Sequence, residues 1–237
     1  MSVTLEAGIT VGAGLGLGPV LPAPVLKLSL DAAGYTSGPW VDSVASRSFT
    51  LYGGASYSAD GGGSLSFVPG SGQYAECTSS LSDLSTWTVI AWHYYAGTNT
   101  SVAPCIITEV FPGVTSNINY TLGCDASGGG NTRLRAGFFN GLWRTTPYTT
   151  LTAGNWYQIV GTYDGTTVKL YVNNTLVQSA SQSGTPISSG AGIRLMSRWD
   201  NADYWGGKLA IVQVYENAMD ASGVSADWST NKTRFGL

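Results

Sequence analysis

The sequence predicts an all-β protein, built as an antiparallel sandwich of two sheets. Runs of alternating apolar and polar residues recur along the chain, and turn residues separate them at intervals of roughly 8–12 residues. Gly, Tyr and Trp are abundant, at 32, 13 and 8 of 237 residues. The pattern is clearest where runs 156–163 and 166–172 flank Asp164-Gly165, and Asn173-Asn174 leads to a further strand at residues 176–177. Asp-Gly favours a hairpin because its tight turn needs φ > 0, which Gly adopts without strain.

Residues 1–24 differ from the rest and are predicted to form an extended N-terminal arm. Gly occupies nearly every other position from Gly8 to Gly18, and three prolines follow by Pro24. Such a segment offers few side chains for packing, and proline favours an extended path. We therefore divide the chain into an arm, 1–24, and one domain, 25–237. The arm is expected to add to a sheet edge of another copy or of a different protein, the alternative being a flexible leader without a role. Its apolar contacts would come from Ile9, Val11, Leu15 and Leu17.

The remaining chain divides into short strands and one short helix near the C-terminus. The expected strands are residues 27–33, 49–51, 57–58, 64–68, 73–76, 87–94, 105–109, 119–123, 134–139, 156–163, 166–172, 176–177, 193–196 and 205–215. Asp220 is expected to cap the helix, and Val224 and Trp228 fall on one of its faces at i, i+4. Position 223 is Gly, so no capping box forms.

Several of these segments together resemble one family. They are the "L-D-A-A" to "W-x-D" segment at residues 30–42, the glycine-rich segment 51–67, the strand 87–92, the block 156–174, the closing strand 205–215 and the "K-T-R-F-G-L" tail at 232–237. They are similar to concanavalin A-like, laminin-G-like jelly-roll proteins, in particular those among the structural proteins of bacteriophages that infect marine bacteria and cyanobacteria.

The resemblance implies a jelly-roll sandwich and a function in the virion. The expected function is that of a non-enzymatic structural protein that decorates or cements the capsid through its arm. The alternative is a carbohydrate-binding module on a tail fibre or capsid appendage that attaches the phage to its host. The implied partners are the major capsid protein or tail components, further copies in a homo-oligomer, and a host glycan. The implied location is the virion, after synthesis in the host cytoplasm.

Composition excludes several other classes of protein. The net charge is −3 and only 11% of residues are charged, so no cationic surface for nucleic acid is expected. No apolar run reaches the roughly 18 residues that a membrane span needs, and the N-terminus lacks the basic region of a secretory signal. The surface is therefore either polar and uncharged or covered by partner subunits. Cys77, Cys105 and Cys124 are expected to be buried free thiols, or one disulfide and one free thiol.

No catalytic constellation is found, and we expect no enzyme. Related glucanases use a strand with three alternating carboxylates, and Glu109 lacks such companions. His93 is the only histidine, and no G-x-S-x-G turn accompanies it. We therefore interpret it as a residue of a sheet surface or of the core.

Two kinds of binding site remain to be considered. The acidic loop residues with which phage relatives bind Ca²⁺ are missing at residues 67–74, so no cofactor is expected, and only Asp200 and Asp203 could supply carboxylate oxygens. For a sugar, aromatic residues near predicted loops could stack on pyranose rings. Alternatively they could plug the ends of the sandwich or lie in an interface, where Trp and Tyr are enriched. These aromatic candidates are Trp143, Trp199, Tyr204 and Trp205.

Overall fold

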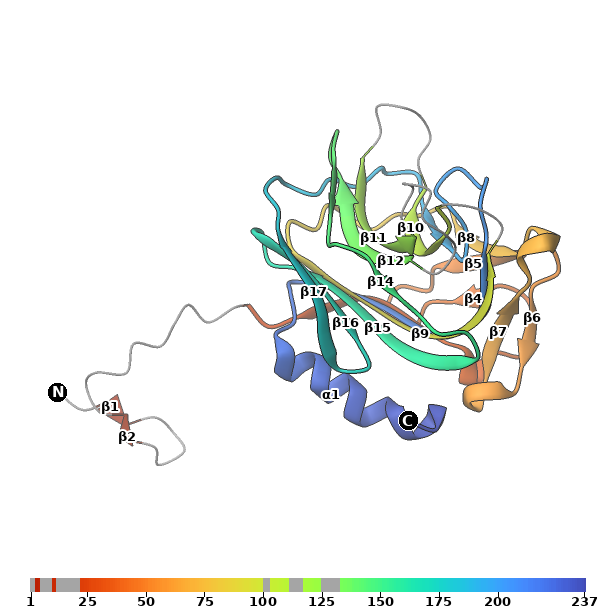
Figure 1. The fold of residues 1–237 in the computed structure, drawn as a ribbon, viewed down its shortest axis with the longest axis horizontal. Helices are drawn as coiled ribbons and strands as arrows, with labels where there is room; N and C mark the ends of the chain where they lie inside the picture. The colour runs from red at the N-terminus through yellow and green to blue at the C-terminus, as the bar shows by residue number, and fades with distance from the viewer. Residues whose placement is uncertain (1–2, 5–9, 12–21, 100–102, 111–116, 125–132) are drawn as a thin grey trace.

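Two antiparallel sheets pack face to face, and one α-helix lies on the outside of one of them (Figure 1). The computed structural model describes residues 3–4, 10–11, 22–99, 103–110, 117–124 and 133–237. The predicted all-β sandwich with one C-terminal helix is confirmed. At the N-terminus, β1 (Val3–Thr4) and β2 (Thr10–Val11) pair with each other. The division of the chain at residue 24 stays a prediction.

The first sheet has nine strands and is called the nine-stranded sheet below. Its strands follow the order β13-β12-β11-β10-β18-β8-β5-β4, and β14 pairs with β12. The bounds are β4 (Trp40–Val41), β5 (Ser48–Tyr52), β8 (Tyr74–Cys77), β10 (Cys105–Glu109), β11 (Ile118–Cys124), β12 (Arg133–Phe139), β13 (Trp143–Thr145), β14 (Thr149–Thr150) and β18 (Ile193–Leu195).

The second, eight-stranded sheet follows the order β17-β16-β15-β9-β19-β7-β6, and β3 pairs with β19. Its long central strands, β9 and β19, pair along most of their lengths. The bounds are β3 (Val25–Asp31), β6 (Ser56–Ser58), β7 (Ser64–Phe67), β9 (Trp87–Asn99), β15 (Asn155–Tyr163), β16 (Thr167–Val172), β17 (Thr175–Ser181) and β19 (Trp205–Glu216). Short 3₁₀ turns lie at η1 (Ala32–Gly34), η2 (Asp60–Gly62), η3 (Pro69–Ser71) and η4 (Lys232–Phe235).

The turns of the 156–177 block form as the sequence predicts. Gly165 has φ +98°, and the carboxylate of Asp164 accepts the backbone N–H groups of Thr166 and Thr167 at 2.9 and 2.8 Å. Asn173 and Asn174 have φ +48° and +62°, which is the positive-φ pair of a two-residue type I′ turn. Both turns are therefore part of the architecture.

The strand alternation separates a core between the sheets from a second apolar layer under α1 (Ala221–Asn231). On β9, Val89 and Ala91 face the core, whereas Trp92 faces the helix layer. Both faces of β9 are buried, which accounts for its nearly continuous apolar run. Cys77 and Cys105 are free and buried, as in the first of the two alternatives, and the side chain of Cys124 lies outside the described residues.

The helix packs on the eight-stranded sheet through the residues that the sequence predicts. Asp220 caps it by accepting the N–H of Gly223 at 2.9 Å. Val224 is fully buried, and the ring of Trp228 stacks on Trp92 with centroids 5.7 Å apart. From the middle of the helix, the Asp227 carboxylate accepts the indole N–H of Trp92 at 3.1 Å. The helix thus covers part of the outer face of this sheet.

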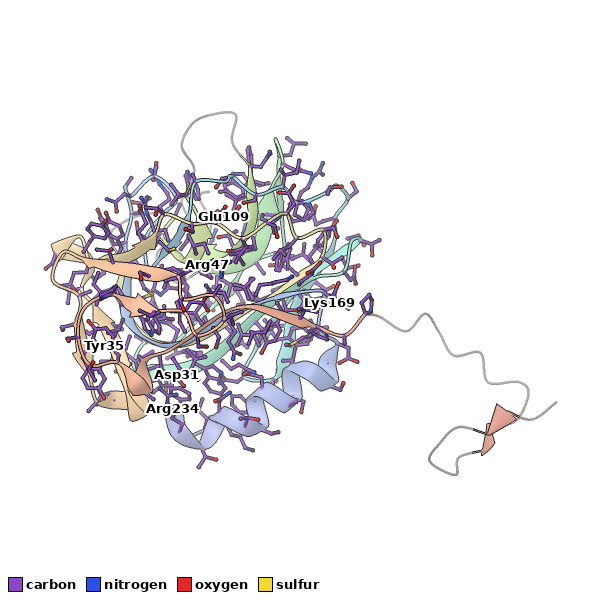
Figure 2. The ribbon with its side chains drawn as sticks, turned by 180° about the vertical axis from the view of Figure 1, so that it is seen from behind. Asp31, Tyr35, Arg47, Glu109, Lys169 and Arg234 are labelled. Carbon is purple, nitrogen blue, oxygen red and sulfur yellow. The ribbon has the colours of Figure 1, made fainter. Side chains whose placement is uncertain are left out.

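The C-terminal tail motif has a structural role. Arg234 donates to both carboxylate oxygens of Asp31 at 2.9 Å, and the two side chains lie next to each other in Figure 2. The Arg234 guanidinium also donates to the carbonyl oxygens of Gly61 and Gly63. The following ring, Phe235, stacks on Trp92 at 4.6 Å. The tail therefore completes the apolar cluster between the helix and the eight-stranded sheet.

Candidate functional site

The outer face of the nine-stranded sheet carries a row of residues that are polar except for one glycine. Its members alternate with core residues such as Ala75, Leu195 and Leu122, so they point away from the sandwich. Each is the register partner of the next across successive strands. In order from β5 to β13 the row is Thr50, Glu76, Arg194, Thr108, Thr121, Gly137 and Thr145.

One group of aromatic rings, the tyrosine cluster, lies near the β5 end of this row. Tyr52 and Tyr74 are register partners, and their rings stack with centroids 4.6 Å apart and planes 10° apart. Tyr204 approaches Tyr74 at 6.2 Å. Tyr52 is the most exposed member, at 40%. The cluster therefore presents one partly exposed ring, Tyr52, that stacks on the ring of Tyr74.

A second group, the tryptophan cluster, lies near the β13 end. Phe139 on β12 and Trp143 on β13 are register partners with ring centroids 5.1 Å apart. The ring of Trp199 lies 5.1 Å from that of Trp143. Trp143 is 41% exposed, which is unusual for so large an apolar side chain in a monomer. This cluster is the second aromatic platform of the same face.

Residues 197–204, called the bridging loop, contribute one ring to each cluster. The loop leaves β18 and returns to β19, and Ser197 bridges to Tyr204 at its base. Arg194 ties it to the sheet, because one guanidinium nitrogen donates to the carbonyl oxygens of Arg198 and Trp199 at 3.3 and 3.0 Å. The rest of that guanidinium is ion-paired with Glu76. Trp199 and Tyr204 are thereby held in defined positions.

The two predicted Ca²⁺ candidates are both bound to an arginine. Arg198 donates to the two carboxylate oxygens of Asp200 at 2.6 and 2.8 Å, and to Asp203 at 2.6 Å. The same guanidinium holds the pKa of Asp200 below its usual value. The Arg198 guanidinium thus already pairs with both carboxylates, which argues against these two weak candidates as metal ligands. The part of the chain described by the structure contains no group of three or more His, Cys, Asp and Glu that could hold a metal ion.

Three of the four aromatic residues proposed for sugar binding come together on this face: Trp143, Trp199 and Tyr204. Trp205 does not, because it is fully buried in the core as the first residue of β19. Its indole N–H donates to Nε2 of His93 at 2.8 Å. The prediction that Trp205 stacks on a sugar is therefore corrected.

Sequence reasoning missed several residues of the face, namely Tyr52, Tyr74, Phe139, Glu76 and Arg194. The alternation within residues 73–76 does place Tyr74 and Glu76 on one side of a strand. That the sequentially distant β5 and β18 flank this strand follows only from the fold.

The predicted arm contacts are not resolved by these observations. Ile9, Leu15 and Leu17 lie outside the described residues, and of Val11 only its place in β2 is described. Assembly through the arm stays a prediction.

Glu109 and His93, the acid and the histidine considered for catalysis, are both buried. Glu109 is fully buried, and its carboxylate accepts the backbone N–H of Asn119 at 2.8 Å and the hydroxyl of Ser188 at 2.6 Å. His93 is also fully buried, and burial lowers its pKa to about 3. On the outer face, Glu76 is ion-paired with Arg194. What this face offers a ligand is therefore mainly aromatic stacking.

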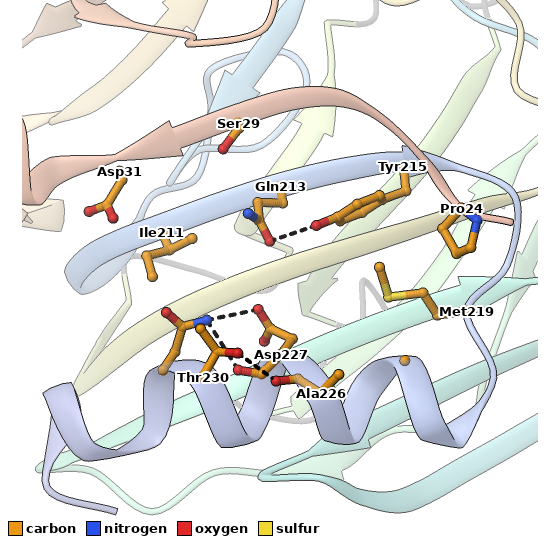
Figure 3. A pocket seen from close by; sticks show the side chains of 12 residues that line it. Pro24, Ser29, Asp31, Ile211, Gln213, Tyr215, Met219, Ala226, Asp227 and Thr230 are labelled. Carbon is orange, nitrogen blue, oxygen red and sulfur yellow. Dashed lines mark hydrogen bonds between the residues drawn. The ribbon is translucent and has the colours of Figure 1, made fainter.

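A separate hollow of about 510 Å³ lies beside the helix, over β19 and β3 (Figure 3). Its polar groups are bonded to one another: the hydroxyl of Tyr215 donates to Gln213 at 3.2 Å, and Asn231 donates to Asp227 at 2.9 Å. Burial raises the pKa of Asp227, which also accepts hydrogen bonds from the sheet. Hydrogen bonds that join the helix to the sheet run from Gln158 and Trp92 on the sheet to the Asp227 carboxylate.

Comparison with known proteins places this fold in context. A family model described as the concanavalin A-like lectin/glucanases superfamily, Laminin_G_3, matches residues 69–225. No protein among the curated sequences matches this chain. None of the helices in the described ranges is long and apolar enough to cross a membrane.

Three solved structures are similar in fold. Domain 4 of AbnA, a GH43 extracellular arabinanase from Geobacillus stearothermophilus in complex with arabinotriose, has a TM-score of 0.67 and 17% identity, over 86% of this chain and 98% of that one. The botulinum neurotoxin type G receptor binding domain has a TM-score of 0.64 and 13% identity, over 87% of this chain and 51% of that one. The Trypanosoma rangeli sialidase in complex with the inhibitor DANA has a TM-score of 0.61 and 13% identity, over 89% of this chain and 34% of that one. The chain thus spans about half of the toxin domain and a third of the sialidase.

Proposed function

The chain belongs to the concanavalin A-like lectin/glucanases superfamily, and from this premise we propose that it binds carbohydrate, without catalysis, at the outer face of the nine-stranded sheet. The observation that carries the proposal is the tryptophan cluster, in which the exposed Trp143 is supported by Phe139 and Trp199. Sugar rings have apolar C–H faces, and a flat indole offers a large, stiff surface for them. Aromatic anchors of this kind dominate binding energy in recognition sites.

The similar structures support this choice among the functions of the family. The arabinanase domain is described in complex with arabinotriose, and the toxin domain is a receptor-binding domain. Their identity to this chain is low, so the proposal depends on the residues of the face itself. The two carboxylates of the bridging loop, Asp200 and Asp203, are ion-paired with Arg198. This arrangement favours binding over general acid and base chemistry.

We place this module on a bacteriophage tail fibre or capsid appendage, where it would attach the particle to a host glycan. This setting is supported by the sequence segments that resemble phage structural proteins, among them the tail 232–237. Capsid decoration through the arm, homo-oligomerisation and location in the virion remain proposals of the same origin. Locating this chain in an electron-microscopy map of the intact particle tests all of them.

Binding itself is tested by a glycan array followed by titration calorimetry with wild type and Trp143→Ala. The exposed 41% of Trp143 corresponds to roughly 100 Å² of a side chain of about 250 Å². At about 25 cal/mol per Å², full coverage by a ligand contributes about 2.5 kcal/mol, and half coverage about half of that. We expect the Kd of Trp143→Ala to rise by roughly tenfold to sixtyfold.

The matched control is Tyr57→Ala, which removes a 46% exposed ring from β6 in the other sheet. Its affinity should equal that of wild type. If wild type binds no glycan on the array, or if Trp143→Ala binds as tightly as wild type, the proposed function is wrong.

A further inference from the structure

We infer that the ligand is an extended stretch of a polysaccharide, lying along the bridging loop and contacting the tyrosine and tryptophan clusters at once. The inference rests on the proposed function and adds the class of ligand: a chain of several sugar units, in place of a single terminal sugar. It also adds a second subsite, in which Tyr52 and Tyr74 join the predicted candidate Tyr204.

The separation of the two clusters requires an extended ligand. Tyr74 lies on β8 and Phe139 on β12, with β18, β10 and β11 between them in the sheet. Four steps between neighbouring strands, at about 4.8 Å each, amount to roughly 19 Å. One sugar ring cannot reach both clusters, whereas a chain of several units can.

The bridging loop makes the two clusters parts of one site. Trp199 stacks against Trp143 in one cluster, and Tyr204 contacts Tyr74 in the other. The backbone between these two residues is closed by the hydrogen bond from Arg198 N–H to the carbonyl oxygen of Asp203 at 2.7 Å. A chain that follows the loop therefore meets one aromatic platform at each end.

The spacing of the platforms is fixed before a ligand arrives. Arg194 is only 8% exposed and joins the loop to β8 through Glu76. Arg198 braces the loop internally through Asp200 and Asp203. Because the loop is already ordered, a long ligand gains contacts at the second platform without the entropic cost of arranging it. Linking two contacts through one chain then raises affinity beyond either alone.

The exposed rings of the two platforms are similarly available. Tyr52 is 40% exposed and Trp143 is 41% exposed, and each has a second ring packed behind it. Two separate and equally open platforms on one face suit a repeating ligand, which offers the same ring face at each end.

The test is a ladder of linear oligosaccharides titrated into the full chain by calorimetry. Arabino-, cello- and laminari-oligosaccharides from the disaccharide to the octasaccharide serve as probes, together with any glycan found on the array. For the series that binds, we expect affinity to rise at least tenfold with length and then to level off once the chain spans both clusters. Tyr52→Ala should abolish this rise, whereas Tyr57→Ala should keep it.

The possible failures are distinguishable. If affinity is the same at all lengths, or if the rise persists in Tyr52→Ala, the extended-chain inference is overturned and carbohydrate binding stands. If wild type binds no oligosaccharide or glycan, the proposed function falls and this inference with it. Thermal unfolding of each variant by circular dichroism verifies that the fold is retained, since Tyr52 lies at the surface.

Discussion

The buried carboxyl of Glu109 makes a specific prediction about stability and pH. Burial raises its pKa from 4.5 to about 7, although its oxygens accept hydrogen bonds from Asn119, Ser188 and Ser189. A raised pKa means that the contribution to stability is fully present below pH 4.5 and is lost as the pH rises through about 7. The perturbation is Glu109→Gln, which keeps the shape and cannot ionise. Its amide oxygen can accept from the two backbone N–H groups, and its amide nitrogen can donate to Ser188.

The magnitude follows from the two pKa values. Their difference corresponds to about 3 kcal/mol of unfolding free energy at about 1.4 kcal/mol for each factor of ten. The unfolding free energy of wild type minus that of Glu109→Gln should therefore fall by about 3 kcal/mol as the pH rises from 4.5 to 8. His93 has a pKa lowered to about 3 and Asp227 has a raised pKa, so both also make stability depend on pH. Their contributions cancel in the difference, because both residues are present in the two proteins.

The assay is urea unfolding followed by tryptophan fluorescence and far-UV circular dichroism, at constant ionic strength and several pH values. His93 loses stability as the pH falls below 6.5, which opposes Glu109, so the wild-type curve should be nearly flat between pH 4.5 and 6.5. Glu109→Gln lacks the opposing group, so its unfolding free energy should fall by about 2 kcal/mol as the pH falls from 6.5 to 4.5. Glu216→Gln, at an exposed carboxylate on β19, measures the effect of removing a surface charge. A difference between wild type and Glu109→Gln that is constant with pH, or that grows as the pH rises, would refute the reasoning.

Three further predictions concern other parts of the molecule. Arg194→Met removes the hydrogen bonds that hold the bridging loop, so the Kd for the bound glycan should rise about tenfold, which corresponds to about 1.4 kcal/mol. The circular dichroism spectrum should remain that of wild type. Unchanged affinity would contradict the positioning role of Arg194. Asp42 is buried and accepts the N–H groups of Ser29, Val44 and Ala45, so Asp42→Ala should cost about 3 kcal/mol in urea unfolding. Because the hydrogen bonds of Asp42 lower its pKa, this cost should shrink as the pH falls below 3.8, and a cost that stays constant would count against it. At Gly161 a Cβ would lie 2.8 Å from Ala136 and Leu122, so Gly161→Ala should cost about 1–3 kcal/mol, and a neutral effect on the melting temperature would argue against this packing.

Local patterns predicted most of the sandwich, because its long strands alternate and its turns need particular residues. Asp164-Gly165 and Asn173-Asn174 are examples in which the backbone requirement is written in the sequence. The short strands β4, β13 and β14 were not predicted. β9 continues to Asn99, beyond the predicted end at residue 94, because β19 pairs with its polar end.

The candidate site was less predictable because it depends on which strands become neighbours. Trp199 and Tyr204 were candidates as aromatic residues near a loop, and that signal is local. Trp205, in the same segment, is the first residue of β19 and points into the core, so one residue along the chain changed a surface ring into a buried one. Tyr52 and Tyr74 became a stacked pair only through the pairing of β5 with β8.

The position of the N-terminal connection relative to the binding face bears on how the protein would work when tethered. Pro24 leads directly into β3, which belongs to the eight-stranded sheet, and Asn217 holds the carbonyl oxygen of Ala23 at 3.0 Å near the end of β19. The aromatic clusters lie on the outer face of the other sheet. An arm that attaches the protein to a particle would therefore hold it by the sheet that carries α1 and leave the nine-stranded sheet facing outward. Attachment through the arm and binding of a glycan would thus be compatible in one molecule, because the chain after the predicted arm enters one sheet and the aromatic clusters lie on the other.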